Sequence, residues 1–336
     1  MTKTRTFIAI IVAAVVVVVG AGFASSQTTF ASSGAGATSL QNAYSAVYKK
    51  VSPSVVQIET SEGLGSGIVF DSAGDVVTNA HVVGTAKTFT VTTSTGKRLT
   101  GKLVGVFSPD DLAVIKVNGA GLKPARFANS DKLAIGDIAM AIGNPLGLSS
   151  SFTEGIVSAL NRQEPEGNGV VLPSAIQTSA AINPGNSGGA LTDIGGAVIG
   201  IPTLAAADPQ LGGAAAGIGF AIPSNVVVNI ANQLVKTGKV TNSNRAYLGV
   251  EIADTPEATG VVLSKVLPGT AAAKAGLVAG DRITSLNGTK TPTSTDLSTA
   301  LAGLKPGQSV KVVVVHQSGG TTTVNLTLGE YPGATS

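Results

Sequence analysis

The chain has 336 residues, of which 43% are hydrophobic and only 12% are charged, and its formal net charge is +3. A chain of this length and apolar content can bury more than one core, and so small a net charge gives no support for nucleic-acid binding. The absence of cysteine excludes disulfides and thiol catalysis, and two histidines are too few for a multi-histidine zinc site, so neither metal nor cofactor is expected.

The N-terminus begins with Lys3 and Arg5, which precede an apolar run over residues 7–19. A positive start before an apolar stretch of this length is typical of a secretory signal. Residues 7–24 are also uncharged and long enough to span a bilayer as an uncleaved anchor. Both interpretations of residues 1–24, signal peptide and N-terminal membrane anchor, stay open. Either one predicts export to the cell envelope, periplasmic or extracytoplasmic, with the rest of the chain secreted or anchored to the membrane.

Residues 25–39 are rich in small polar residues and carry no charge, which favours a flexible linker. Apolar residues then recur at helical spacing, from Leu40 through Tyr44 and Val47 to Val51, and Pro53 follows. This spacing predicts a short amphipathic helix over residues 40–51.

From Ser54 to about Val228, short runs rich in Val, Ile, Thr and Phe are separated by Gly, Asn, Asp or Pro. About a dozen such strands favour two small antiparallel barrels over a doubly wound sheet, which needs long helices between strands. A helix is expected over residues 225–237. The predicted strands are 55–59, 67–70, 76–79, 88–93, 99–107, 113–117, 138–142, 152–159, 175–177, 190–192, 197–202 and 217–221.

Residues 245–330 alternate differently and predict a small α+β module after a polar linker over residues 239–244. Two short helices are expected, at 271–275 and 296–303, because Thr293 and Ser294 can cap the second and Gly276 can end the first. The predicted strands are 248–252, 260–266, 282–286, 309–316 and 321–328.

Residues 185–189 read Gly-Asn-Ser-Gly-Gly and carry the sharpest chemical signal. A serine attacks a carbonyl when a base takes its proton and backbone N–H groups stabilise the oxyanion. The segment also matches the Gly-x-Ser-x-Gly elbow of α/β-hydrolases. In those enzymes the histidine follows the serine, and here the only later histidine is His316, in a Val-rich strand. An α/β-hydrolase therefore remains only as an alternative.

The order histidine, aspartate, serine is that of chymotrypsin-like proteases, and His81, Asp111 and Ser187 satisfy it. His81 follows one predicted strand and Asp111 precedes another, so both lie where a strand meets a loop. Asp110 is a rival for the role of the triad carboxylate. The order predicts that Ser187 is the nucleophile and His81 its base.

With these motifs the chain resembles the HtrA (Deg) family of serine proteases, which have a trypsin-like domain and here one C-terminal PDZ domain. The resemblance implies a mainly β fold, a chymotrypsin-like double antiparallel β-barrel over residues 40–238 followed by a small α+β PDZ domain over residues 245–330. It also implies a catalytic triad of His81, Asp111 and Ser187 and an oxyanion hole of Gly185 and Ser187. The matching segments are 51–56, 65–67, 78–83, 111–116, 143–145, 155–159, 176–178, 181–189 and 219–223.

The chymotrypsin-like pattern also implies a primary substrate pocket. It would be lined by Ala181, six residues before the serine, by Ile182, and by Phe220 in the backing strand, none of them charged. Two departures from the family pattern fall nearby. Ser179 replaces an acidic residue after Gln-Thr, and Pro202 replaces Asn in the strand beside the bound substrate, where it brings no N–H.

Tyr247, Leu248, Gly249 and Val250 match the carboxylate-binding loop of PDZ domains, which implies binding of peptide C-termini by strand addition. Leu297 and Leu301 would line the far wall of that groove or pack in the core.

The resemblance implies a serine-type endopeptidase that acts without cofactor on exported, unfolded or damaged proteins, and a homo-oligomer, a trimer in the family. The alternative is a chaperone or PDZ adaptor with a resting protease domain, gated by loops at residues 161–170 and 203–217 that look flexible.

Overall fold

The computed structural model describes residues 36–61, 63–118, 121–144, 151–167, 170–183, 185–208, 213–254 and 259–332. The chain divides into two units, Met1–Lys49 and Lys50–Ser336. The predictions for residues 1–24 and for the linker up to residue 35 lie outside the described residues. A helix covers residues 36–51 and begins four residues before the predicted one. None of the helices in the described residues has the length and hydrophobicity of a membrane-spanning segment.

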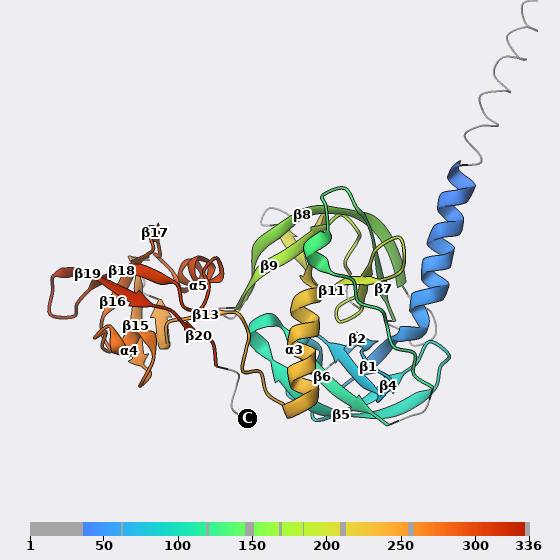
Figure 1. Cartoon of the computed structure of the whole chain (residues 1–336), viewed down its shortest axis with the longest axis horizontal. Coiled ribbons are helices and arrows are strands. Elements are labelled where there is room, and N and C mark those ends of the chain that lie inside the picture. The colour runs from blue at the N-terminus through green and yellow to red at the C-terminus, as the bar shows by residue number, and fades with distance from the viewer. Residues whose placement is uncertain are drawn as a thin grey trace, which may run out of the picture. The chain divides into compact units, whose positions relative to one another are not determined.

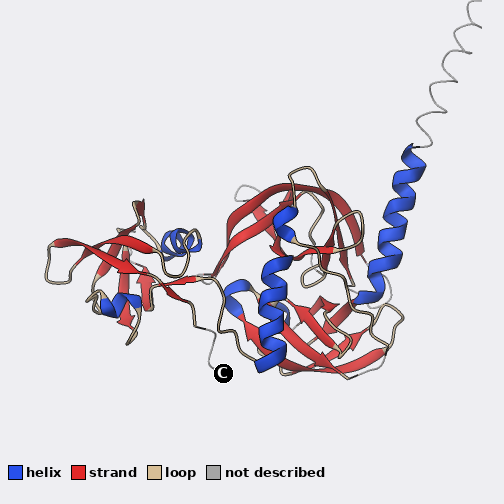
Figure 2. Ribbon diagram, in the orientation of Figure 1, coloured by secondary structure: helices blue, strands red, loops and turns tan. Residues whose placement is uncertain are grey.

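The second unit begins with a closed six-stranded antiparallel barrel (Figures 1 and 2). Its strand order is β1-β2-β3-β6-β5-β4, and the pairing of β1 with β4 closes it. The branched apolar side chains that predicted these strands fill the barrel, and Val56, Ile58 and Ile115 are fully buried. The strands are β1 (Val55–Glu59), β2 (Leu64–Val69), β3 (Asp75–Thr78), β4 (Thr88–Thr92), β5 (Arg98–Phe107) and β6 (Leu112–Val117).

A second closed barrel follows, with the strand order β10-β11-β12-β9-β8-β7. The expectation of flexible loops was wrong for two of its hairpins. The described parts of residues 161–170 and 203–217 are strands, because β8 pairs with β9 out to Gly167↔Val170 and β11 pairs with β12 out to Asp208↔Gly213. The strands are β7 (Ile138–Gly143), β8 (Ser151–Gly167), β9 (Val170–Thr178), β10 (Ala190–Thr192), β11 (Val198–Asp208) and β12 (Gly213–Pro223).

The predicted helix α3 (Ser224–Thr237) lies against strands of both barrels, including β5 and β11 (Figure 1). It buries Val227, Ile230 and Leu234, which recur at helical spacing, and Gly238 ends it in a left-handed conformation. The short helices of the barrels are η1 (Ser52–Ser54), α2 (Ala80–Val83), η2 (Ser108–Asp110) and η3 (Ser130–Lys132).

The C-terminal module, residues 245–330, is a sheet in the order β14-β15-β16-β18-β19, with β17 paired to β16 and a separate pair β13-β20. Its capped helix α5 (Ser294–Ala302) starts at a capping box of Thr293 and Asp296. The remaining elements are α4 (Ala271–Lys274), β13 (Ala246–Tyr247), β14 (Val250–Asp254), β15 (Val261–Val266), β16 (Arg282–Leu286), β17 (Thr289–Lys290), β18 (Ser309–Val315), β19 (Thr321–Thr327) and β20 (Gly329–Glu330).

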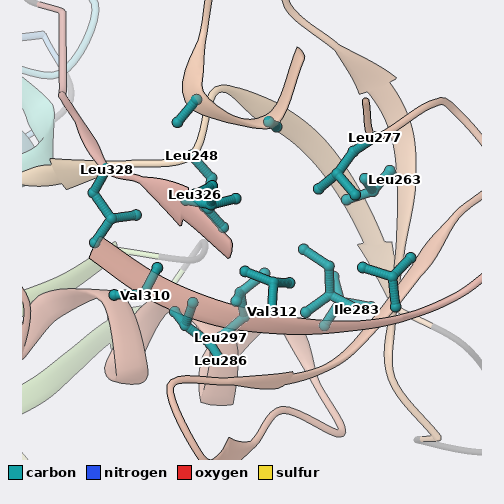
Figure 3. Close-up of a cluster of buried hydrophobic side chains, with 14 residues drawn as sticks. Leu248, Leu263, Leu277, Ile283, Leu286, Leu297, Val310, Val312, Leu326 and Leu328 are labelled. Carbon is teal, nitrogen blue, oxygen red and sulfur yellow. The ribbon is translucent and has the colours of Figure 1, made fainter. Parts of the chain in front are cut away.

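One apolar core holds this module together (Figure 3). Alternate residues of β18, Val310, Val312 and Val314, point to the same side and are buried, as the period of a strand requires. Leu297 of α5 packs on them with 1% of its surface exposed, so its main contact is with the core. A mainly β fold of two barrels and a small α+β module is therefore confirmed, and it excludes an α/β-hydrolase.

Candidate active site

His81 and Asp111 come together at one end of the first barrel, where β3 ends and β6 begins. The main chain between β3 and α2 is held by Asp111, whose carbonyl accepts hydrogen bonds from Asn79 Nδ2 at 3.1 Å and from the N–H of Ala80 at 3.0 Å. The Asp111 carboxylate accepts a bond from the N–H of His81 at 2.9 Å through Oδ1, and Oδ2 lies 2.8 Å from His81 Nδ1. Both the position and the orientation of the imidazole therefore depend on Asp111.

Asp111 takes a left-handed backbone conformation, with φ 49° and ψ 44°, which aspartate tolerates better than most residues. Its side chain is 6% exposed, whereas 51% of the His81 side chain is exposed. A buried carboxylate with several donors therefore holds the half-exposed imidazole by its Nδ1 side.

The neighbouring Asp110 points elsewhere. Its Oδ1 lies 2.6 Å from Nη1 of Arg245, in a pair whose side chains are 2% and 16% exposed. The choice between the two aspartates is therefore made by the backbone turn at residue 111. Of the two aspartates, Asp111 is the one that contacts His81.

Ser187 lies in the glycine-rich turn between β9 and β10, and Ser66 of β2 holds that turn against the first barrel. The N–H of Ser66 donates to the carbonyl of Ser187 at 2.9 Å, and its hydroxyl donates to the carbonyl of Gly185 at 2.5 Å. Gly188 has φ +79°, and a Cβ there would lie 2.2 Å from the Ser66 carbonyl oxygen. The close approach of two barrels at this point therefore requires a glycine after the serine.

Thr203 of β11 contacts both halves of the site. Nothing in the sequence marks it except its position one residue after Pro202. Its hydroxyl donates to Oδ2 of Asp111 at 2.6 Å, while its carbonyl accepts a hydrogen bond from Oγ of Ser187 at 3.0 Å. One residue of the second barrel thus contacts both the buried carboxylate and the serine.

The expected oxyanion hole is the space in front of the N–H groups of Gly185 and Ser187. Neither N–H donates to the main-chain carbonyl of another described residue. The turn itself is held by the N–H of Gly189, which donates to Asn186 at 2.9 Å, and by the N–H of Gly188, which donates to Pro202 at 3.0 Å. Pro202 therefore keeps a structural role through its carbonyl, although it has no N–H.

The three residues expected in the substrate pocket lie in two segments: Ala181 and Ile182 are in the loop that follows β9, and Phe220 is in β12. Ala181 is exposed, and its carbonyl accepts a bond from Asn186 Nδ2 at 3.3 Å. Ile182 is 7% and Phe220 3% exposed, and Ile182 packs so closely on Gly219 that a Cβ there would lie 2.4 Å from it. Ser179, the other departure from the family pattern, accepts a bond from the N–H of Ile156 at 3.0 Å through Oγ.

The C-terminal module has a groove between β14 and α5. Tyr247, Leu248, Gly249 and Val250 line one side of it, and Leu297, Leu301 and Ala302 of α5 line the other. Gly249 has φ +82°, and a Cβ there would lie 2.1 Å from the Cβ of Thr270, so the turn into β14 requires glycine. Because β14 is the end strand of its sheet, one of its edges is available for an added strand.

His316 belongs to the same module and not to the serine site. Its Nδ1 lies 2.8 Å from Oδ1 of the buried Asp281, and its Nε2 lies 3.1 Å from Oγ1 of Thr322. It thus contacts the turn before β16 and the start of β19.

Two family comparisons cover most of the two modules. The trypsin-like peptidase domain matches residues 65–201, and the PDZ domain matches residues 246–328.

Curated relatives are similar over most of this chain. The chain is 41% identical over 276 residues to "Periplasmic pH-dependent serine endoprotease DegQ" of Escherichia coli, which covers 80% of this chain and 59% of that protein. It is 39% identical over 309 residues to "Serine protease PepD" of Mycobacterium tuberculosis, covering 84% of this chain and 65% of PepD. The chain thus spans about three fifths of the length of these relatives.

Solved structures match over nearly their whole length. An "HtrA-type protease AlgW with tripeptide" is 32% identical, with a TM-score of 0.59 over 86% of this chain and 97% of that one. The "serine endoprotease from Yersinia pestis" is 31% identical, with a TM-score of 0.59 over 86% of this chain and 98% of that one.

Proposed function

Because the chain belongs to the HtrA family of serine proteases, we propose that it is an exported serine endopeptidase that hydrolyses unfolded or damaged proteins. The observation that carries the proposal is the convergence on Thr203. Its hydroxyl contacts Asp111, its carbonyl contacts Ser187, and Asp111 in turn bonds to His81. The serine hydroxyl, the imidazole and the carboxylate, which a serine protease needs together, therefore belong to one hydrogen-bonded network.

In the proposed mechanism, Ser187 Oγ attacks the scissile carbonyl while His81 Nε2 takes its proton and later returns it to the leaving amine. Asp111 Oδ2 accepts a hydrogen bond from the N–H at His81 Nδ1 and so leaves Nε2 as the base. The N–H groups of Gly185 and Ser187 stabilise the oxyanion of the tetrahedral intermediate. A water molecule then attacks the acyl-enzyme while His81 Nε2 takes its proton, and Nε2 returns that proton to Ser187 Oγ as the acid product leaves.

A fluorophosphonate probe tests this proposal directly, because such reagents react with a serine whose base is in place. We expect one adduct per chain, on the tryptic peptide that contains Ser187, together with loss of casein digestion. Labelling of any other serine, or casein digestion that survives full labelling, contradicts the proposal.

The lining proposed for the primary pocket predicts its specificity. Residues 179–183 and 217–222 contain no charged residue, so a Lys or Arg side chain would lose hydration there without gaining a partner. Aliphatic side chains would gain roughly 1–3 kcal/mol by burial. We expect cleavage after Val, Ala, Ile, Leu or Met and no inhibition by benzamidine. Mass spectrometry of casein fragments measures this, and cleavage mainly after Lys or Arg would show that the pocket is placed wrongly.

The groove between β14 and α5 supports a second part of the proposal, that this PDZ domain binds peptide C-termini. A peptide adding to the edge of β14 would place its terminal carboxylate at the turn of Leu248 and Gly249 and its last side chain between β14 and α5.

Gly249→Ala tests that groove, because the new Cβ collides with Thr270 at a position where φ is positive. We expect roughly tenfold or greater loss of affinity for a fluorescein-labelled peptide that ends in free valine. Gly307→Ala is the matched control, since Gly307 has a similar φ of +79° but open space around it. If the Gly249→Ala variant bound the peptide as tightly as the wild type does, the peptide would not bind in this groove.

The remaining parts of the proposal concern the whole protein. We place the protease domain at residues 40–238 and the PDZ domain at residues 245–330. We interpret residues 1–24 as a signal peptide or membrane anchor. Two curated relatives are named as periplasmic, which supports export. A homo-oligomer, a trimer by family resemblance, remains part of the proposal.

A further inference from the structure

A buried ion pair connects the segment before the PDZ domain to the turn that carries Asp111. Nη1 of Arg245 lies 2.6 Å from Oδ1 of Asp110, and Nη2 donates to the carbonyl of Val171 in β9 at 2.9 Å. The two paired residues are 135 positions apart in the sequence. The pair therefore joins two distant segments of the chain.

The burial of this pair distinguishes it from the surface pairs of the molecule. The Asp110 side chain is 2% exposed, and burial raises its pKa while the Arg245 guanidinium lowers it. A buried carboxylate that loses its partner must take up a proton or move towards water. Burial leaves the pKa of Asp110 raised overall, and Arg245 opposes that rise and holds the carboxylate in place.

Asp110 is the last residue of η2, and the next residue is Asp111 in its left-handed conformation. The N–H of Asp111 donates to the carbonyl of Ser108 at 3.0 Å, so the two aspartates belong to one tight turn. Their carboxylates point apart, one to Arg245 and the other to His81. A movement that releases Asp110 therefore cannot leave Asp111 unchanged.

A second contact supports the turn from the same direction. The ring of Tyr331, just after β20, meets the ring of Phe107 edge-on at 6.1 Å, and the N–H of Tyr331 donates to the carbonyl of Arg245 at 2.9 Å. Phe107 immediately precedes η2 and is fully buried. Both ends of the turn are thus held from the segments that bracket the PDZ domain.

We propose that Arg245 is a positioning residue for the protease site, which acts through Asp110 to fix the orientation of Asp111 and hence of His81. The inference rests on the proposed endopeptidase function. It assigns to a residue outside both barrels a role in the rate of the chemical step.

The test measures kcat and KM on a short quenched peptide with an amidated C-terminus, which lacks the carboxylate that a PDZ groove would bind. Arg245→Met should lower kcat roughly 10- to 100-fold, because small displacements of catalytic groups have effects of this size. KM should stay within about twofold, since Arg245 does not contact the expected substrate site. The control is Arg98→Met, from the exposed pair of Arg98 and Glu59 in the first barrel, which should change neither constant.

Two further variants separate positioning from damage to the fold. Arg245→Lys should recover part of kcat, because an ammonium can still pair with Asp110. The double variant Asp110→Asn/Arg245→Met should have a higher kcat than Arg245→Met alone, because it leaves no unpaired buried charge. Thermal unfolding of each variant gives the folded fraction at the assay temperature.

Three results would overturn the inference: a wild-type kcat in Arg245→Met, a change confined to KM, or a loss that follows the unfolded fraction and is relieved in neither further variant. Wild-type protein that does not cleave the peptide or casein would instead refute the endopeptidase function itself. Active wild type with an unaffected Arg245→Met would refute the positioning role alone.

Discussion

Replacing Ser187 with alanine is expected to abolish proteolysis, with kcat on unfolded casein falling by roughly 10⁶-fold, because no other group can form the acyl-enzyme. The fold should not change, since the contacts that hold the turn run through the main chain of Ser187 and Gly185 to Ser66. The measurement compares initial rates and unfolding curves of variant and wild type at equal concentration.

The matched control for this prediction is Ser61→Ala, at an exposed serine in the turn between β1 and β2. It should cleave casein at the wild-type rate. Normal cleavage by Ser187→Ala would remove the serine from the mechanism and with it the whole assignment of the site.

The second large effect is expected for Asp111→Asn, which keeps the size of the side chain but not its charge. An amide in place of Oδ2 can donate to Nδ1 of His81, which then carries its proton on Nε2 and is no longer a base. The expected loss in kcat is about 10⁴-fold, the size of effect that the wrong tautomer has in such triads. Rates on casein and on a short peptide should fall together.

Asp75→Asn provides the comparison for that variant. Asp75 is a similarly buried aspartate of the first barrel, 3% exposed, whose Oδ2 lies 2.8 Å from Nζ of Lys116. Its replacement should lower the thermal midpoint and leave kcat close to that of the wild type. If both variants lost activity equally, the role of Asp111 would be structural and not electrostatic.

Local patterns predicted most of the longer strands and helices. Branched apolar runs fill the barrels and alternate along β18, and Thr293, one of the two residues expected to cap α5, does cap it. The outer parts of two hairpins, residues 161–170 of β8 with β9 and 203–217 of β11 with β12, were expected to be loops, because Pro and Gly interrupt their apolar pattern. Hydrogen bonding between the paired strands extends these hairpins, and a pattern read over a few neighbouring residues does not reveal such pairing.

The order of the motifs along the sequence was sufficient to predict only part of the site. Order identifies His81 and Ser187, yet Asp110 and Asp111 are adjacent and share the same signal. The left-handed turn at Asp111 and the distant Arg245 decide which carboxylate faces the imidazole. Thr203 was missed for the same reason, since it lies 92 residues from Asp111 in the sequence.

The two barrels and the PDZ sheet differ in how exposed their strand edges are. Both barrels close on themselves, so every one of their strands has two neighbours, whereas β14 ends its sheet. An open edge of this kind can pair with any extended chain and is a starting point for aggregation. The register shift at Glu251 and Ile252, with the charges of Glu251 and Asp254, interrupts a long flat edge. The strand available to a short peptide is thereby a poor template for the polymerisation of unfolded chains.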